Sequence, residues 1–153
     1  MSLCLSCRDK LISPGYFLLF TPADLDFFID FELRDRARRL SLSSPHDDPA
    51  RRSRRVPTAS EYAAHCVSQG YEPVSSVANG GAYRVILLHE AGRHYFPRDG
   101  QDLEAVKTWH GAPMAAMVCA LRAGFRRWWI ENVPRNVKGK LETLGRLYRG
   151  GVG

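Results

Sequence analysis

The sequence lacks the short motifs that mark common catalytic and nucleotide-binding sites. It contains no glycine-rich phosphate loop, no GxGxxG, no HExxH, no nucleophile elbow and no kinase signature. No apolar run approaches the roughly 18 residues that span a membrane. No charged N-terminal segment precedes an apolar one, so we expect no secretory signal. These absences favour a cytoplasmic, non-enzymatic protein.

Cysteine and histidine are also too sparse to form a recognisable metal site. Cys4 and Cys7 form a CxxC, but neither a second CxxC nor an HxxxH is present to complete a structural zinc site. His89 and His94 flank a predicted turn and are weak candidates for a metal or acid–base role. Without a secretory signal, the four cysteines are expected to be reduced thiols. We therefore predict neither a bound metal nor a cofactor.

Basic charge is abundant and is concentrated at one end of the chain. The net charge is +6 over 153 residues. The last 32 residues carry eight basic and two acidic residues, whereas the remaining 121 residues carry equal numbers of each. Such asymmetry indicates a polyanionic or acidic partner, because a clustered positive surface attracts negative charge.

The length predicts a single compact domain over 1–153, since two cores would be crowded in so short a chain. Residues 42–57 are rich in serine, proline and charge, which is typical of a flexible basic loop. This loop contains four arginines within five positions, Arg51, Arg52, Arg54 and Arg55. Residues 150–153 are predicted to form a frayed tail.

Two helices are predicted in the first half. Residues 21–41 alternate in part between apolar and polar residues, as a strand does, but Thr21 as an N-cap and several acid-before-base pairs four residues apart favour a helix. Thr58 and Glu61 form a capping box at the start of the second helix, which Gly70 ends.

Strands are predicted at 16–20, 71–78, 82–90 and 93–96. The sequence Asn79-Gly80-Gly81 predicts a hairpin turn between the second and third of them. The run from Val85 to Leu88 is apolar on both faces, so its strand is expected to be central and covered on both sides.

Three further helices are predicted in the second half. They cover 101–110, 113–129 and a last segment for which Asn136 is the expected cap. In this last segment Val137, Leu141, Leu144 and Tyr148 form one apolar stripe. The apolar stripe expected in 113–129 includes Val118. The expected fold is therefore α+β, a single domain with a three- to four-stranded antiparallel meander and four to five helices.

The strongest candidate for a binding surface is basic and aromatic. Arginines contact phosphates, and an exposed aromatic ring stacks on a base. We predict contacts to nucleic acid, to a nucleoprotein complex or to an acidic protein surface from the C-terminal residues Arg122, Arg126, Arg127, Trp129, Arg135, Lys138 and Lys140, with additional contacts from Arg51, Arg52, Arg54 and Arg55.

Two other functions remain open at this point. One is a protein-directed inhibitor or adaptor of the kind that phages and mobile elements encode against host defences. The other is a small hydrolase that uses His89, His94 and Cys66.

Overall fold

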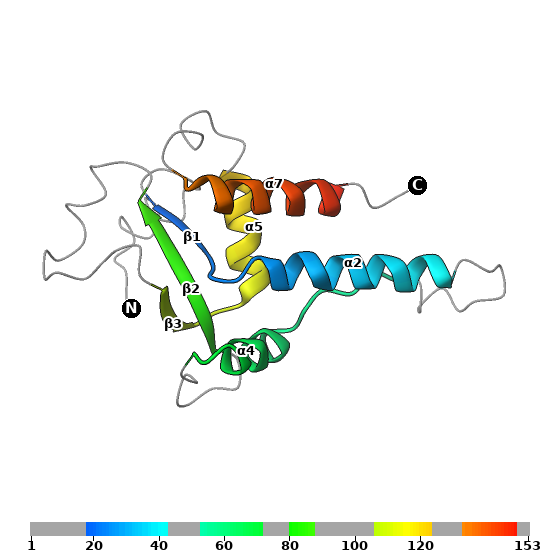
Figure 1. Ribbon diagram of the computed structural model, residues 1–153, viewed down its shortest axis with the longest axis horizontal. Coiled ribbons are helices and arrows are strands. Elements are labelled where there is room, and N and C mark those ends of the chain that lie inside the picture. The colour runs from blue at the N-terminus through cyan, green and yellow to red at the C-terminus, as the bar shows by residue number, and fades with distance from the viewer. Residues whose placement is uncertain (1–17, 43–52, 72–79, 88–105, 124–132, 150–153) are drawn as a thin grey trace, which may run out of the picture.

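The computed structural model describes residues 18–42, 53–71, 80–87, 106–123 and 133–149. These residues form a three-stranded antiparallel sheet and four helices, so the α+β class is confirmed (Figure 1). The elements are β1 (Leu18–Pro22), α2 (Asp26–Ser41), α4 (Ala59–Ser68), β2 (Gly80–Leu87), β3 (Val106–His110), α5 (Pro113–Ala123) and α7 (Arg135–Arg149).

The sheet has the order β1-β2-β3, with β2 in the middle. Leu19 of β1 lies opposite Ile86 of β2, and both are buried on one face of the sheet. Tyr83 projects from the other face of β2 and is also buried. The prediction that the strand containing Val85 and Ile86 is central is confirmed within the described residues.

The prediction of a hairpin turn at Asn79-Gly80-Gly81 is wrong at the two glycines. Gly80 and Gly81 belong to β2 and lie opposite His110 and Trp109 of β3. A side chain at Gly81 would have its Cβ only 2.7 Å from the Tyr62 ring. Glycine is needed there for close packing of a helix on the strand rather than for a turn.

The sheet joins three segments that are far apart in the sequence, and they pair in chain order, each strand antiparallel to the next. Two helices, α2 and α4, separate β1 from β2 along the chain. The strands predicted at 71–78 and 93–96 lie outside the described residues.

The helix expected at 101–110 is wrong where the structure describes it, because Val106–His110 is strand β3. Valine, threonine and tryptophan favour extended structure. Pairing with β2 supplies hydrogen-bond partners for this backbone, a long-range contribution that the local pattern does not reveal.

The helix expected at 21–41 is confirmed, but its start was placed too early. Thr21 lies in β1, and α2 begins at Asp26 with Leu25 at the N-cap position. Asp24 supplies the capping interaction, since its Oδ1 accepts hydrogen bonds from the backbone N–H groups of Asp26 and Phe27. The acidic side chain thus caps a helix from two residues before its start.

The other helices follow the sequence more closely. The capping box of Thr58 and Glu61 is confirmed at the start of α4, and Gly70 follows that helix with φ of 84°. In α5, Val118 is exposed, so its expected place in the buried stripe is wrong. Asn136 lies inside the first turn of α7 and does not cap it, because this helix begins at Arg135.

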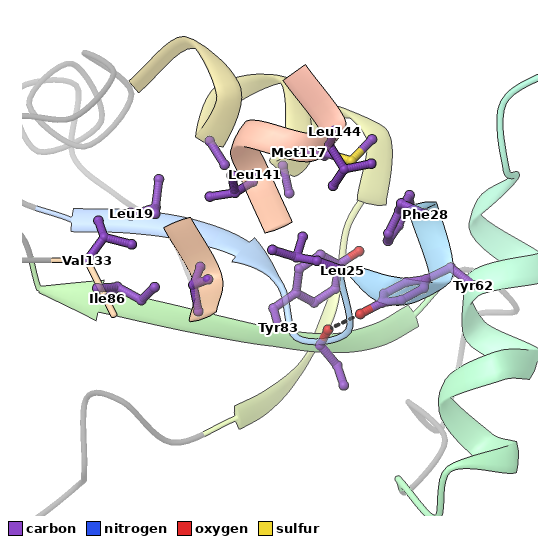
Figure 2. Packing of buried hydrophobic residues seen from close by; sticks show 14 of the residues in the cluster. Leu19, Leu25, Phe28, Tyr62, Tyr83, Ile86, Met117, Val133, Leu141 and Leu144 are labelled. Atoms are coloured by element: carbon purple, nitrogen blue, oxygen red, sulfur yellow. Dashed lines mark hydrogen bonds between the residues drawn. The ribbon is translucent and has the colours of Figure 1, made fainter. Parts of the chain in front are cut away.

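A single buried cluster joins the sheet to the helices (Figure 2). The hydroxyl of Tyr62 donates a 2.6 Å hydrogen bond to the carbonyl of Ala82 and accepts one from the N–H of Ala23. These bonds tie α4 to β2 and to the end of β1. Among the described helices, none is both long and apolar enough to cross a membrane.

A candidate nucleic-acid interface on α7

The outer face of α7 carries most of the exposed arginines at the C-terminal end of the described chain. Arg135, Gly139, Glu142, Arg146 and Arg149 are all exposed. Steps of three or four residues place them in one line along the helix. We call these five residues the α7 ridge. Glu142 is the only acidic residue in the helix.

Burial of the opposite face of α7 makes the ridge point away from the core. Val137, Leu141 and Leu144 are buried in the core, and Tyr148 packs against it, as the apolar stripe predicted. A basic amphipathic helix of this kind can also lie on a membrane surface. The apolar face of α7 is already covered by the protein core, so only its polar face is available to a partner.

Arg122 adds a further exposed arginine near the C-terminal half of α7. It lies in the last turn of α5, which packs against β1 and α7 (Figure 1). The preceding residue, Leu121, reaches α7 at Gly145, where its Cδ2 would lie 3.7 Å from an added Cβ. Arg122 therefore follows directly after the residue at which α5 meets α7.

The two lysines of α7 and Arg55 are partly engaged with acids. Lys140 Nζ lies 2.5 Å from a carboxylate oxygen of Asp26, which links α7 to the start of α2. Lys138 lies 4.0 Å from Glu142 within the helix. Arg55 is exposed and lies 3.7 Å from Glu61. The pairs of Lys138 and Arg55 are long surface pairs, whereas the short contact of Lys140 joins α7 to α2.

Arg54 is engaged within the fold. Its guanidinium lies 2.7 Å from Oε2 of Glu32, donates a hydrogen bond to the carbonyl of Tyr148 and stacks on the Tyr148 ring with 4.0 Å to the centroid. Arg54 therefore connects α2 to α7, and it is not among the residues proposed below to contact a partner. Residues 43–52 lie outside the described residues, so the flexibility of that part of the basic loop remains a prediction.

A second carboxylate on α2 extends this arrangement. Glu32 is 2% exposed and Asp35 is 5% exposed, so both are buried acids on one helix face. Arg39 contacts both of them, and Arg38 contacts Asp35 at 2.6 Å. We call Glu32, Asp35, Arg38, Arg39 and Arg54 the charge cluster. Every buried carboxylate in it faces at least two guanidinium groups.

The charge cluster affects the pKa of one of its carboxyls and of the neighbouring Tyr148. Burial alone would raise the pKa of Asp35, but hydrogen bonds from Arg38 and Arg39 outweigh burial and hold that pKa below its ordinary value. Burial, together with the negative charge of Glu32, raises the pKa of Tyr148 to about 12. Asp35 is therefore ionised at neutral pH, while the Tyr148 hydroxyl is neutral.

A histidine–carboxylate pair is the main feature with the chemistry of an active site. Nε2 of His65 lies 2.6 Å from Oδ2 of Asp24, and the ring stacks on Phe27. The neighbouring thiol of Cys66 is buried and accepts the N–H of Ala82. Among the described residues, Ser68 Oγ bonds only to the backbone carbonyl of His65, and no serine, threonine or cysteine side chain bonds to its ring. The pair therefore serves to connect α4 with the start of α2.

Several predicted site residues lie outside the described residues: Arg51, Arg52, Arg126, Arg127, Trp129, Cys4, Cys7, His89 and His94. Cys66 is described, and its burial argues against the nucleophilic role considered for it. Within the described part of the chain, no group of three or more potential ligands lies close enough to hold a metal ion.

Comparison with protein-family models, with curated proteins and with solved structures finds no significant match to this chain. Any functional inference therefore depends on the contacts and charges of its own residues.

The sequence-based prediction missed two arginines of the ridge and one exposed aromatic ring. Arg146 and Arg149 continue the spacing that starts at Arg135, and counting positions 135, 139, 142, 146 and 149 would have found them. Trp109 is exposed on β3, at the edge of the sheet, with Phe20 and Tyr83 against it. It was missed because its segment was predicted as a helix.

Proposed function

We propose that this protein is a small, non-enzymatic, cytoplasmic binding protein that contacts nucleic acid through the α7 ridge and Arg122. The observation that carries the proposal is the outward line of Arg135, Arg146 and Arg149 on a helix whose other face is buried. A rigid helix presents these charges at fixed spacing, which suits the regular phosphates of a nucleic-acid backbone.

The mechanism is electrostatic. Each arginine that neutralises a phosphate releases condensed counterions, so the affinity falls as salt rises. The planar guanidinium can bond two phosphate oxygens at once, which a lysine ammonium does not match. The described ridge contributes phosphate contacts, and these position a partner without reading its base sequence.

The test is a titration of fluorescein-labelled 20-nucleotide RNA and 20-base-pair DNA, followed by fluorescence anisotropy at several salt concentrations. Arg135→Gln/Arg146→Gln removes two contacts. The slope of log affinity against log salt should become shallower by about 1.8 for the duplex and about 1.4 for the single strand. A form of nucleic acid whose slope does not change on this substitution does not engage the two arginines.

The matched control is Arg34→Gln/Arg36→Gln, which removes the same charge from exposed positions on α2. This control should keep the wild-type slope within about half a unit, because neither arginine belongs to the proposed interface and no phosphate contact is lost. If the wild-type protein shows no salt-dependent binding to either probe, or if both double variants lose affinity equally, the proposed interface is wrong.

A protein-directed inhibitor or adaptor is the second candidate, and apolar side chains on the outer side of α2 favour it. Leu33 and Leu40 are 48% and 65% exposed and lie two helical turns apart. Protein interfaces use such anchors at their centres. Co-purification of one defined host protein, lost on Leu33→Asp while the fold is retained, would support this candidate over nucleic-acid binding.

A further inference from the structure

Two glycines interrupt α7, and their surroundings differ. A Cβ at Gly145 would meet Cδ2 of Leu121 and Nη2 of Arg149, each at 3.7 Å, so Gly145 lies where α5 crosses α7. A Cβ at Gly139 would meet nothing within 4 Å. Gly139 is exposed in the interior of the helix, where glycine costs about 1 kcal/mol relative to alanine.

The surroundings of Gly139 are polar and mainly hydrogen-bond donors. Arg135 lies one turn before it, Glu142 and Thr143 lie one turn after it, and Arg146 lies two turns after it. Asn136 is exposed on the adjoining side of the helix. The lack of a side chain at Gly139 leaves the helix backbone uncovered between Arg135 and Arg146, with Glu142 as the one acidic residue of α7 nearby.

We propose that the sugar–phosphate backbone of a nucleic acid crosses α7 directly over Gly139, with Arg135 and Arg146 holding phosphates on either side. This inference rests on the proposed function and specifies where the backbone passes. Arg135 and Arg146 are eleven residues apart, about 16 Å along the helix axis at 1.5 Å per residue.

The chemistry of approach explains why a methyl group matters at this point. A phosphate oxygen bonds a guanidinium at about 2.9 Å, so the backbone must come close to the helix surface while both arginines reach it. A methyl group at Gly139 lifts the strand away and lengthens both contacts. In the free protein the same methyl group strengthens the helix, because alanine is the better helix former.

The experiment compares Gly139→Ala, Gly139→Leu and Gly145→Ala with the wild type, using the labelled 20-nucleotide RNA and 20-base-pair DNA as probes. Thermal unfolding is measured on the same samples. Gly139→Ala should raise the melting temperature by several degrees and weaken binding about fivefold, with Gly139→Leu weakening it further. Gly145→Ala is the matched control, for which we expect unchanged affinity, since its added methyl makes ordinary contacts within the protein.

The outcomes separate this inference from the proposed function. Higher stability of Gly139→Ala with wild-type affinity overturns the crossing point, while loss of binding in Arg135→Gln/Arg146→Gln still supports the interface. Lower stability of Gly139→Ala also overturns the inference, because Gly139 would then have a role within the fold. Equal binding by the wild type and the arginine double variant removes the proposed function itself.

Discussion

The charge cluster and the α7 ridge use the same residue type for opposite purposes. In the cluster, Arg38, Arg39 and Arg54 surround two buried carboxylates and hold the fold together. On the ridge, the arginines are exposed, and Glu142 is the only acidic residue of α7. The number of arginines is therefore a poor guide to a binding surface, and the position of the acids decides which arginines are available to a partner.

The largest effect on stability is expected from Arg54→Met. This change leaves the buried Glu32 with Arg39 as its remaining described cation and removes the ring contact to Tyr148. Urea unfolding should show a loss of about 2 to 3 kcal/mol, because charged hydrogen bonds to a buried carboxylate are costly to remove. Arg55→Met is the control, with an expected loss below about 0.5 kcal/mol for an exposed pair.

A smaller and pH-dependent effect is expected from Asp35→Asn. The folded pKa of Asp35 lies below its ordinary value of 3.8, so its ionised form is stabilised in the folded state. Its contribution is fully present above that ordinary value and is lost as pH falls through the lower folded pKa. Urea unfolding at neutral pH should show a loss of about 1 to 2 kcal/mol.

The pH series supplies the control for this second variant. The difference in unfolding free energy between wild type and Asp35→Asn should be constant from pH 7 to 5 and shrink in stronger acid. A difference that stays the same down to the lowest pH at which both proteins fold would contradict the role of the ionised carboxylate.

Sequence reasoning worked where the cause lies within a few residues. The capping box of Thr58 and Glu61 and the apolar stripe of α7 depend on spacing within one helix, and both were predicted. The charge cluster could not be predicted in this way, because Arg54 reaches Glu32 across 22 residues and Tyr148 across 94. From the sequence, Arg54 was therefore interpreted as one of several arginines in a flexible basic loop.

Strand β3 and the two glycines of β2 illustrate the same limit. Pairing between segments more than 20 residues apart fixes Val106–His110 as a strand, whereas the local sequence suggested a helix. Gly81 was predicted to lie in a turn. Glycine is needed there because the Tyr62 ring, which belongs to helix α4, packs against this position. Of the three ridge arginines, Arg135 was predicted as a contact residue, whereas Arg146 and Arg149 were not.

An intermediate case between the two regions is Lys140, which was expected to contact a partner and is paired with Asp26. Lys140→Met should lower the unfolding free energy by less than about 1 kcal/mol, as is usual for an exposed ion pair. Its effect on nucleic-acid affinity should be smaller than that of Arg146→Gln, because it points toward α2. Equal losses of affinity would extend the binding surface to the α2 side of the helix.

The smallest effect on stability is expected for changes on the ridge. Arg135→Gln/Arg146→Gln should leave the unfolding free energy within about 0.5 kcal/mol of the wild type, since neither side chain is buried. Urea unfolding checks this, with circular dichroism as a control for the fold. A loss comparable to that of Arg54→Met would show that the ridge also holds the fold together, and the contrast between the two regions would disappear.

The most direct test of the central claim is the affinity for labelled nucleic acid across one charge series on the ridge. The series runs from Glu142→Gln through the wild type and Arg146→Gln to Arg135→Gln/Arg146→Gln, with Arg34→Gln/Arg36→Gln as the control of equal charge on α2. We predict that affinity falls in that order, with Glu142→Gln tightest, while the control stays near the wild type. If affinity follows net charge alone, so that the α2 control falls as far as the ridge double variant, the ridge is not the binding surface.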